Sequence, residues 1–154
     1  MSENRQINFV IPGEPVAKAR PRVVRLKSGA AHSYTPKETV SYENLVRICF
    51  LDEVGTDFKP MVGQFVLKVD AYFSMPKSRP KKWQQLASAG IIRPTKRPDW
   101  DNVGKIVSDA LNGIAYRDDS AIVDAWIRKW YSDQPRVEVR IIDITDKLDT
   151  WSRE

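Results

Sequence analysis

Five charged residues near the middle of the chain have the types and spacing of a metal-dependent site. Asp99 and Asp101 stand two residues apart, Lys105 follows, and the adjacent pair Asp118 and Asp119 comes shortly after. Carboxylate oxygens suit Mg²⁺ or Mn²⁺, whereas a zinc site would need cysteines and histidines, of which this chain has one each. Crowded carboxylates repel one another unless a cation neutralises them or one is protonated. The pattern therefore predicts a Mg²⁺ site, with Mn²⁺ as an alternative ion.

A metal held in this way suits chemistry on phosphate. Such an ion can activate water and stabilise the charge that builds up during phosphodiester hydrolysis. Lys105 offers a further cation to the phosphate or to the leaving oxygen. These residue types therefore favour cleavage of a nucleic-acid backbone.

A helix should position the acids. Apolar residues between 102 and 112 recur at helical spacing, and Asp101 is the expected N-cap. Asn112 and Gly113 form a C-terminal signal in which Gly113 is the left-handed residue. If the chain doubles back after this helix, the second acidic pair converges with the first.

The polar face of the same helix leaves another interpretation open. Asp101, Lys105, Asp109 and Asn112 line this face at 100° per residue. An ordinary amphipathic helix also turns such a stripe toward solvent. Asp109 is interpreted as a helix-surface or supporting residue and not as a ligand.

The strands are predicted from alternation and turn signals. Residues 6–11 and 64–73 alternate strongly, and residues 121–131 and 136–142 are expected to pair as a hairpin. Ser28-Gly29 could turn a second, shorter hairpin. The basic residues around that turn would then sit on a projecting arm.

Two further helices are indicated by capping signals. A capping box with Thr35 as N-cap and Pro36 as the first helical residue begins a helix that reaches about Glu53. Ser78 can cap a shorter helix that ends at Gly90.

Several single residues outside the acidic segment could also carry chemistry. Cys49 lies on an apolar helix face and is interpreted as core, and His32 as a surface or phosphate-contacting residue. Asp70 is interpreted as a solvent-exposed strand acid. Trp126 and Trp130 share one strand face, which is either a stacking surface for bases or a stripe in the core or at a dimer interface.

Composition limits the class of protein. A chain of 154 residues with 42% hydrophobic residues can bury the core of one domain, and its single cysteine excludes an internal disulfide. No apolar run approaches the roughly 18 residues of a membrane span, and the first residues lack the apolar stretch of a signal peptide. We therefore expect a cytoplasmic protein with no membrane partner, a main domain over 1–142 and a polar tail over 143–154.

Many of the lysine and arginine residues are concentrated in two segments that contain no aspartate or glutamate. The net charge is +5, yet Pro15–Lys37 and Ala71–Pro98 contain no acid and hold thirteen of the 25 Lys and Arg residues. Segregated bases are typical of a surface that binds a polyanion, and two solvated loops are the alternative. The residues expected to contact DNA backbone are Lys18, Arg20, Arg22, Arg25, Lys77, Arg79, Lys81, Lys82, Lys96 and Arg97.

The central segment resembles the signature of a known family. Its string P-D-W-D-N-V-G-K-I-V-S-D-A-L-N-G-I-A-Y-R-D-D-S-A-I-V is similar to that of the RusA family of Holliday junction resolvases, roughly D-x-D-N-x-x-K, then D-A-L-N-G, then a D-D pair and a strand. The earlier stretch P-G-E-P-V-A-K-A-R-P-R also resembles the family's opening. The resemblance covers most of residues 7–142.

The resemblance implies a homodimeric α+β fold, with a mixed β-sheet packed against helices, that binds four-way junction DNA. It implies paired, symmetric nicks made with Mg²⁺ in DNA recombination and repair, in a bacterial or phage-encoded protein. The family's metal-binding acids correspond to Asp99, Asp101 and Asp119, and its catalytic lysine to Lys105. Asp118 is the neighbouring acid of the pair.

The chain departs from the family's usual pattern at two positions. Trp100 stands between the acids where an aliphatic residue is common, and could be a core anchor or could stack near the junction. Gly104 weakens the first helical turn by about 1 kcal/mol relative to alanine. Neither change removes a ligand.

Two other functions remain open. The first is a catalytically inactive junction-binding module with an architectural or regulatory role, and the second is a general structure-selective nuclease.

Overall fold

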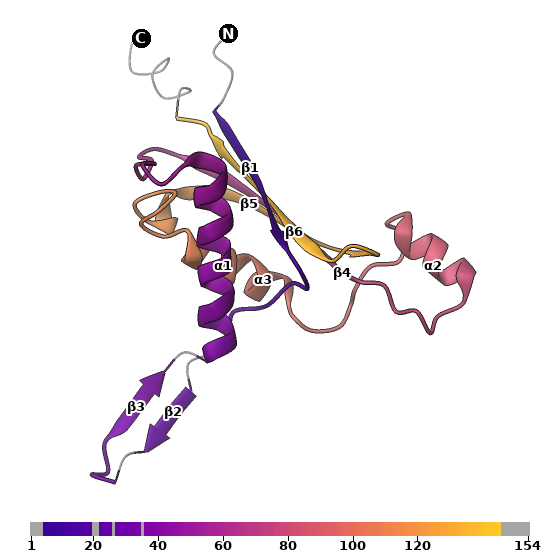
Figure 1. The fold of residues 1–154 in the computed structure, drawn as a ribbon, viewed down its shortest axis with the longest axis horizontal. Coiled ribbons are helices and arrows are strands. Elements are labelled where there is room, and N and C mark those ends of the chain that lie inside the picture. The colour runs from indigo at the N-terminus through magenta and orange to yellow at the C-terminus, as the bar shows by residue number, and fades with distance from the viewer. Residues whose placement is uncertain (1–4, 20–21, 26, 35, 146–154) are drawn as a thin grey trace.

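The computed structural model describes residues 5–19, 22–25, 27–34 and 36–145. Figure 1 shows a mixed sheet, three helices and a separate hairpin, so the predicted α+β class is confirmed. No described helix is both long and apolar enough to span a bilayer. In chain order the elements are β1 (Gln6–Pro12), β2 (Arg22–Arg25), β3 (Ala31–Tyr34), α1 (Lys37–Val54), β4 (Phe65–Ser74), α2 (Lys81–Ser88), α3 (Trp100–Ala110), a short 3₁₀ turn (Asp119–Ala121), β5 (Ile122–Ser132) and β6 (Arg136–Asp143).

The four-stranded sheet has the order β1-β6-β4-β5. The β4/β5 pair is parallel, whereas β6 runs antiparallel to both β1 and β4. Parallel neighbours need a crossover connection, because a tight turn can only join antiparallel strands. That crossover spans residues 75–121, and it contains α2, α3 and every acid of the predicted site.

The predicted pairing of residues 121–131 with 136–142 is wrong. These segments form β5 and β6, but β4 lies between them and bonds to both. The turn at 133–135 therefore passes over the end of β4, where the Met75 amide donates to the Ser132 carbonyl. A strand such as β4 has hydrogen-bonding groups on both edges and can therefore separate two strands that follow each other in the sequence, as it separates β5 and β6.

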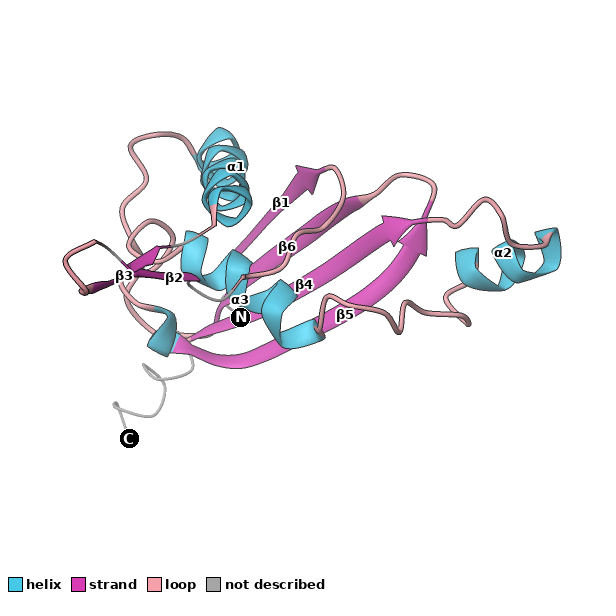
Figure 2. Ribbon diagram, turned by 90° about the horizontal axis from the view of Figure 1, so that it is seen from below, coloured by secondary structure: helices cyan, strands magenta, loops and turns pink. Residues whose placement is uncertain are grey.

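One face of the sheet carries the core. Figure 2 shows α1 and α3 on this face, where the alternate residues of β1, β4 and β6 are buried. Phe50 of α1 packs edge-on against Phe9 and Phe58, with ring centroids 5.5 and 5.3 Å away. Cys49 is half-buried against the same cluster, which agrees with its interpretation as a core residue.

Two helices begin later than their capping signals suggest. Pro36 is the N-cap of α1 and not its first helical residue, while the predicted cap Thr35 lies outside the described residues. α2 follows Pro80 and not Ser78. In both cases an extended proline precedes the helix, and a fixed φ near −65° with no N–H makes that position suitable for a helix entrance.

Asp70 is not solvent-exposed as predicted. It is 6% exposed, and its carboxylate accepts hydrogen bonds from Arg128 Nε at 2.9 Å and from Trp130 Nε1 at 2.8 Å. Arg128 and Trp130 come from β5 and cover Asp70 on the face of the sheet opposite the helices. Strand alternation gives the face on which a residue lies, but large neighbours on that face can still bury it.

We expect Asp70→Ala to lower the free energy of unfolding by roughly 2–3 kcal/mol, because it leaves the Trp130 N–H and part of the Arg128 guanidinium without an acceptor. Asp70→Asn keeps one oxygen acceptor and should cost less. Urea unfolding monitored by tryptophan fluorescence measures both. Asp133→Ala, at an exposed turn position, is the control and should change stability by about 0.5 kcal/mol or less. Equal losses for the Asp70 and Asp133 variants would contradict the role of Asp70.

Candidate active site

The N-terminus of α3 places the first two acids. Asp99 is the N-cap, with an extended backbone at φ −68° and ψ 150°, and Asp101 lies in the first turn. Asp101 was predicted as the cap, so the helix begins earlier than expected. The Asp99 carbonyl accepts the first helical bond from the Val103 amide at 3.2 Å, while its side chain makes no capping hydrogen bond. Acids at a helix N-terminus are favoured by the helix dipole.

The chain doubles back after α3, as the convergence of the two acidic pairs requires. Gly113 adopts φ +74°, and its amide donates to the Tyr116 carbonyl at 2.8 Å. Tyr116 is fully buried and its hydroxyl donates to the Ser108 carbonyl of α3 at 2.7 Å. The Asn112 side-chain oxygen then accepts from the Asp119 backbone amide at 2.8 Å. This compact reversal brings Asp119 beside α3.

Three of the four predicted catalytic residues meet in one pocket. Asp101, Lys105 and Asp119 line a hollow of about 290 Å³ between α3 and β5. The exposed Trp100 also lines this pocket, so its interpretation as a core anchor is wrong. The floor is apolar and includes Ile127 of β5. Two carboxylates and one ammonium group therefore face a common space above an apolar surface.

Asp99 faces a neighbouring pocket. That pocket, of about 690 Å³, is lined by Asp99, Asn102, Lys18 and Arg97. Two helical steps rotate a side chain by about 200°, which explains why the cap and the first turn point to different sides. Among the residues that the structure describes, no three carboxylate, histidine or cysteine side chains lie close enough together to hold one ion.

The acidic pair after the reversal is electrostatically asymmetric. Burial raises the pKa of Asp119, and the carboxylates of Asp118 and Asp109 raise it further. The hydroxyl of Ser120 donates to Asp118 and holds the pKa of that carboxyl below its usual range, so Asp118 stays ionised. A cation beside Asp119 would relieve this repulsion.

The donor set fits a hard divalent cation. Mg²⁺ commonly takes one or two protein carboxylates and completes its shell with water and substrate phosphate oxygens. Asp101 and Asp119 supply two carboxylates to one pocket. Asp99 could supply a third only from the adjoining pocket.

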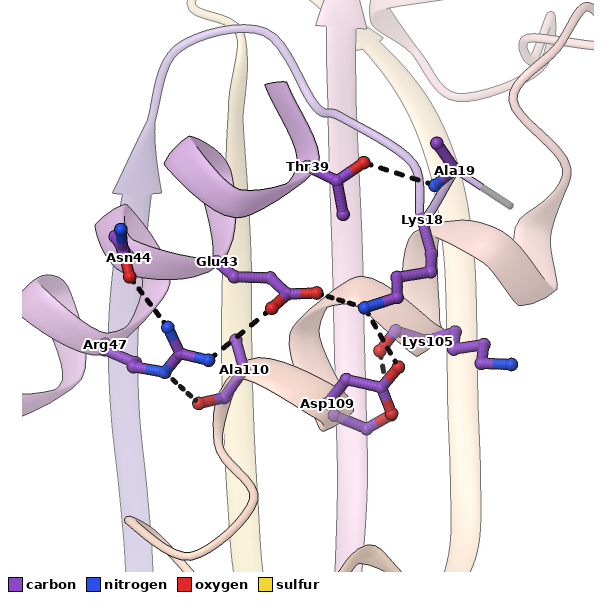
Figure 3. A network of polar contacts seen from close by, with 10 residues as sticks. Lys18, Ala19, Thr39, Glu43, Asn44, Arg47, Lys105, Asp109 and Ala110 are labelled. Carbon is purple, nitrogen blue, oxygen red and sulfur yellow. Dashed lines mark hydrogen bonds and ion pairs between the residues drawn. The ribbon is translucent and has the colours of Figure 1, made fainter. Parts of the chain in front are cut away.

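A polar network joins α1, α3 and the segment after β1 on the side of α3 next to the site (Figure 3). Lys18 contacts Glu43, and its Nζ lies 3.5 Å from Asp109. Arg47 donates to the Ala110 carbonyl at the end of α3 at 3.0 Å. Figure 3 shows the Lys105 side chain directed away from the Lys18–Asp109 pair. Lys18 therefore neutralises acids of the scaffold, and its predicted contact with DNA stays a prediction.

The other predicted DNA-contacting residues occupy two projections. Arg25 is exposed on the β2/β3 hairpin, which extends beyond the start of α1 (Figure 1). Arg20 and the side chain of Arg22 lie outside what the structure describes. The remaining residues are all exposed. Lys77, Arg79, Lys81 and Lys82 lie in or near α2, at the other end of the molecule, whereas Lys96 and Arg97 lie closer to α3, where Arg97 lines the pocket of Asp99.

Sequence reasoning missed two positioning residues. Asn112 was interpreted as a helix-end signal and as part of the polar helix face, but not as the residue that holds the Asp119 backbone. Trp130 was interpreted as a base-stacking residue or as part of a stripe in the core or at a dimer interface. It is half-buried, donates to Asp70, and has the Arg93 guanidinium 3.4 Å from its ring centroid. Trp126 is 49% exposed, with Lys68 Nζ 4.7 Å from its ring. The Asn-Gly turn just before an acidic pair could have indicated Asn112, whereas nothing local indicates the packing of Trp130.

Comparison with known proteins agrees with this geometry. Residues 12–142 match the family described as RusA, endodeoxyribonuclease RusA. The chain is also 38% identical over 144 residues to the uncharacterized protein YqaN of Bacillus subtilis (strain 168), covering 90% of this chain and 97% of that protein. The matched region includes the reversal, the two pockets and both basic projections.

If the pocket of Asp101, Lys105 and Asp119 cleaves DNA, Asn112→Ala should slow that cleavage by about 10- to 100-fold, because a small displacement of a reacting group is enough for such a loss. The exposed site should make the loss of stability small, about 1 kcal/mol or less. Single-turnover cleavage rates at saturating metal, with thermal unfolding of the same samples, separate the two effects. A wild-type rate in a folded variant would contradict the positioning role. Gln134→Ala, at an exposed turn remote from α3, is the control.

Proposed function

The chain belongs to the RusA family of endodeoxyribonucleases, and from that premise we propose that it resolves Holliday junctions by paired, symmetric cleavage of phosphodiester bonds. The observation that supports the proposal best is the shared pocket of Asp101, Lys105 and Asp119, built by the reversal after α3. A metal-dependent nuclease needs oxygen ligands for a cation beside a surface that collects phosphates, and the carboxylates of this pocket and the exposed bases of the chain suit these two tasks.

Mg²⁺ is the proposed cofactor, with Mn²⁺ as an alternative. We propose Asp101 and Asp119 as its ligands, and Asp99 as a third that would have to reach the ion from the adjoining pocket. Bound there, the ion would supply Lewis-acid activation of water and of the scissile phosphate. Lys105 would donate to a phosphate or leaving oxygen on the same side of α3. The exposed bases of the two projections would hold the DNA backbone.

Asp101→Asn tests the metal site. The substitution removes a charged ligand but little volume, so we expect cleavage of a synthetic four-way junction in Mg²⁺ to fall by at least about 100-fold, while junction binding without metal is retained. Mg²⁺ should also raise the unfolding temperature of the wild type more than that of the variant, because a ligand that binds the folded state stabilises it. Cleavage at the wild-type rate would show that the assignment is wrong. Asp133→Asn is the matched control.

A catalytically inactive junction-binding module is the second candidate. The observation that favours it is that Asp99 faces a different pocket from Asp101 and Asp119. Incubating junction DNA with and without Mg²⁺ separates the two functions, since the module would bind and never nick. Comparing junction, flap and duplex substrates then distinguishes a resolvase from a general structure-selective nuclease.

We also propose a homodimer, because a four-way junction with two-fold symmetry needs two active sites related by the same symmetry. The sheet face opposite α1 and α3 is the proposed interface. It exposes about half of Val10 and of Trp126, at 50% and 49%. Arg136 and Glu138 lie on the same face and pair with each other at 3.1 Å, and Glu138 is the cross-strand neighbour of Val10, so this ion pair borders an exposed apolar side chain on the proposed interface.

Trp126→Asp should weaken this dimer, because it replaces the exposed ring of Trp126 by a short charged side chain on the proposed interface. Sedimentation equilibrium should give a wild-type mass of twice the 17.7 kDa chain and a variant mass shifted toward one chain. Trp100→Asp is the matched control, since Trp100 is also exposed but lies on the helical side of the sheet. A wild-type mass of one chain at micromolar concentration would rule out the dimer.

A further inference from the structure

Residues 76–97, here called the α2 lobe, carry α2 past the end of the sheet and then return along β5 toward α3 (Figures 1 and 2). The lobe contains no aspartate or glutamate. Its exposed bases repel one another and have no carboxylate within the lobe to balance them. They are Lys77, Arg79, Lys81, Lys82, Lys96 and Arg97.

The lobe is firmly attached to the edge strand β5. The Arg93 guanidinium stacks on Trp130, and its Nε donates to the Lys129 carbonyl. Lys129 Nζ in turn donates to the Lys96 carbonyl at 2.8 Å. Gly90 passes so close to Trp130 that an added Cβ would lie 2.9 Å from the ring. These contacts give the exposed bases a fixed position relative to the sheet.

The aromatic side chain of α2 is already used inside the protein. Trp83 packs against Tyr131 of β5, with ring centroids 5.4 Å apart, and Arg79 lies over the Trp83 ring at 5.1 Å. Proteins that bind single strands present free aromatic faces on which bases stack. The lobe presents cations instead, which suits the regular phosphates of a duplex.

We propose that the α2 lobe is a separate binding surface for a duplex arm of the junction, in contact with its phosphates beyond the point where the strands cross. The proposal rests on the proposed junction-resolving function. Arg97, the last residue of the lobe, lines the pocket of Asp99, so basic side chains extend from the lobe to the edge of the candidate site. Within one chain the β2/β3 hairpin lies at the other end of the molecule, so the α2 lobe is the projection beside the start of α3 that would contact this arm.

The test uses the full chain and an immobile four-way junction with arms of about 20 base pairs, each close to 70 Å long at 3.4 Å per base pair. Lys81→Ala/Lys82→Ala removes two exposed charges, and Lys81→Arg/Lys82→Arg is the control that keeps them. Without metal, the alanine variant should bind about tenfold or more weakly near 0.1 M salt, and its slope of log affinity against log salt should fall by about two. The arginine variant should behave as the wild type.

Hydroxyl-radical footprinting locates the lost contact. The wild type should protect both the crossover and phosphates along a duplex arm, and the alanine variant should lose only the arm protection. An unchanged affinity and footprint for the alanine variant, or a loss confined to the crossover, would overturn the proposal. A wild type that binds and protects no junction would instead overturn the proposed function, so the two failures are distinguishable.

Discussion

The parallel pairing of β4 with β5 is the constraint on which the rest of this structure depends. Because parallel neighbours cannot be joined by a tight turn, the chain must leave one end of the sheet and return to the other. The long connection that results carries α2, α3 and the acidic reversal. Both the candidate pocket and the most basic projection are therefore products of one topological requirement.

The placement of charge follows from the same connection. The acids lie at the two ends of α3, where a helix N-terminus favours Asp99 and Asp101 and the reversal places Asp119. The bases lie in the α2 lobe and on the β2/β3 hairpin, away from the core. A protein that must approach phosphate and also hold a cation needs both signs, and most of the exposed bases lie away from Asp101 and Asp119, whose pocket also contains Lys105. Among the residues predicted to contact DNA, Lys18 differs from the exposed bases of the α2 lobe because it pairs with Glu43 and Asp109 and so helps to join α1 to α3.

Local patterns predicted the parts of this fold that local forces determine. The periodicity of α3, the left-handed Gly113 and the alternation of β4 were all visible in sequence because each depends on a few neighbouring residues. Asp101, Lys105 and Asp119 could be proposed as a group for the same reason. What failed depends on distant contacts. The insertion of β4 between β5 and β6, and the burial of Asp70 by side chains of β5, involve residues about 60 positions apart.

Gly104 shows how a locally unfavourable residue can be required by the site. In a helix it costs about 1 kcal/mol relative to alanine. A Cβ at this position would lie 2.7 Å from Ile127 Cδ1 and 3.0 Å from Cγ1 of the same side chain. The glycine therefore lets α3 approach β5 more closely than any other residue would. Because Asp101 and Lys105 flank Gly104 on the helix and Ile127 forms the pocket floor, that close approach sets how deeply the carboxylate and the ammonium group sit beside Asp119.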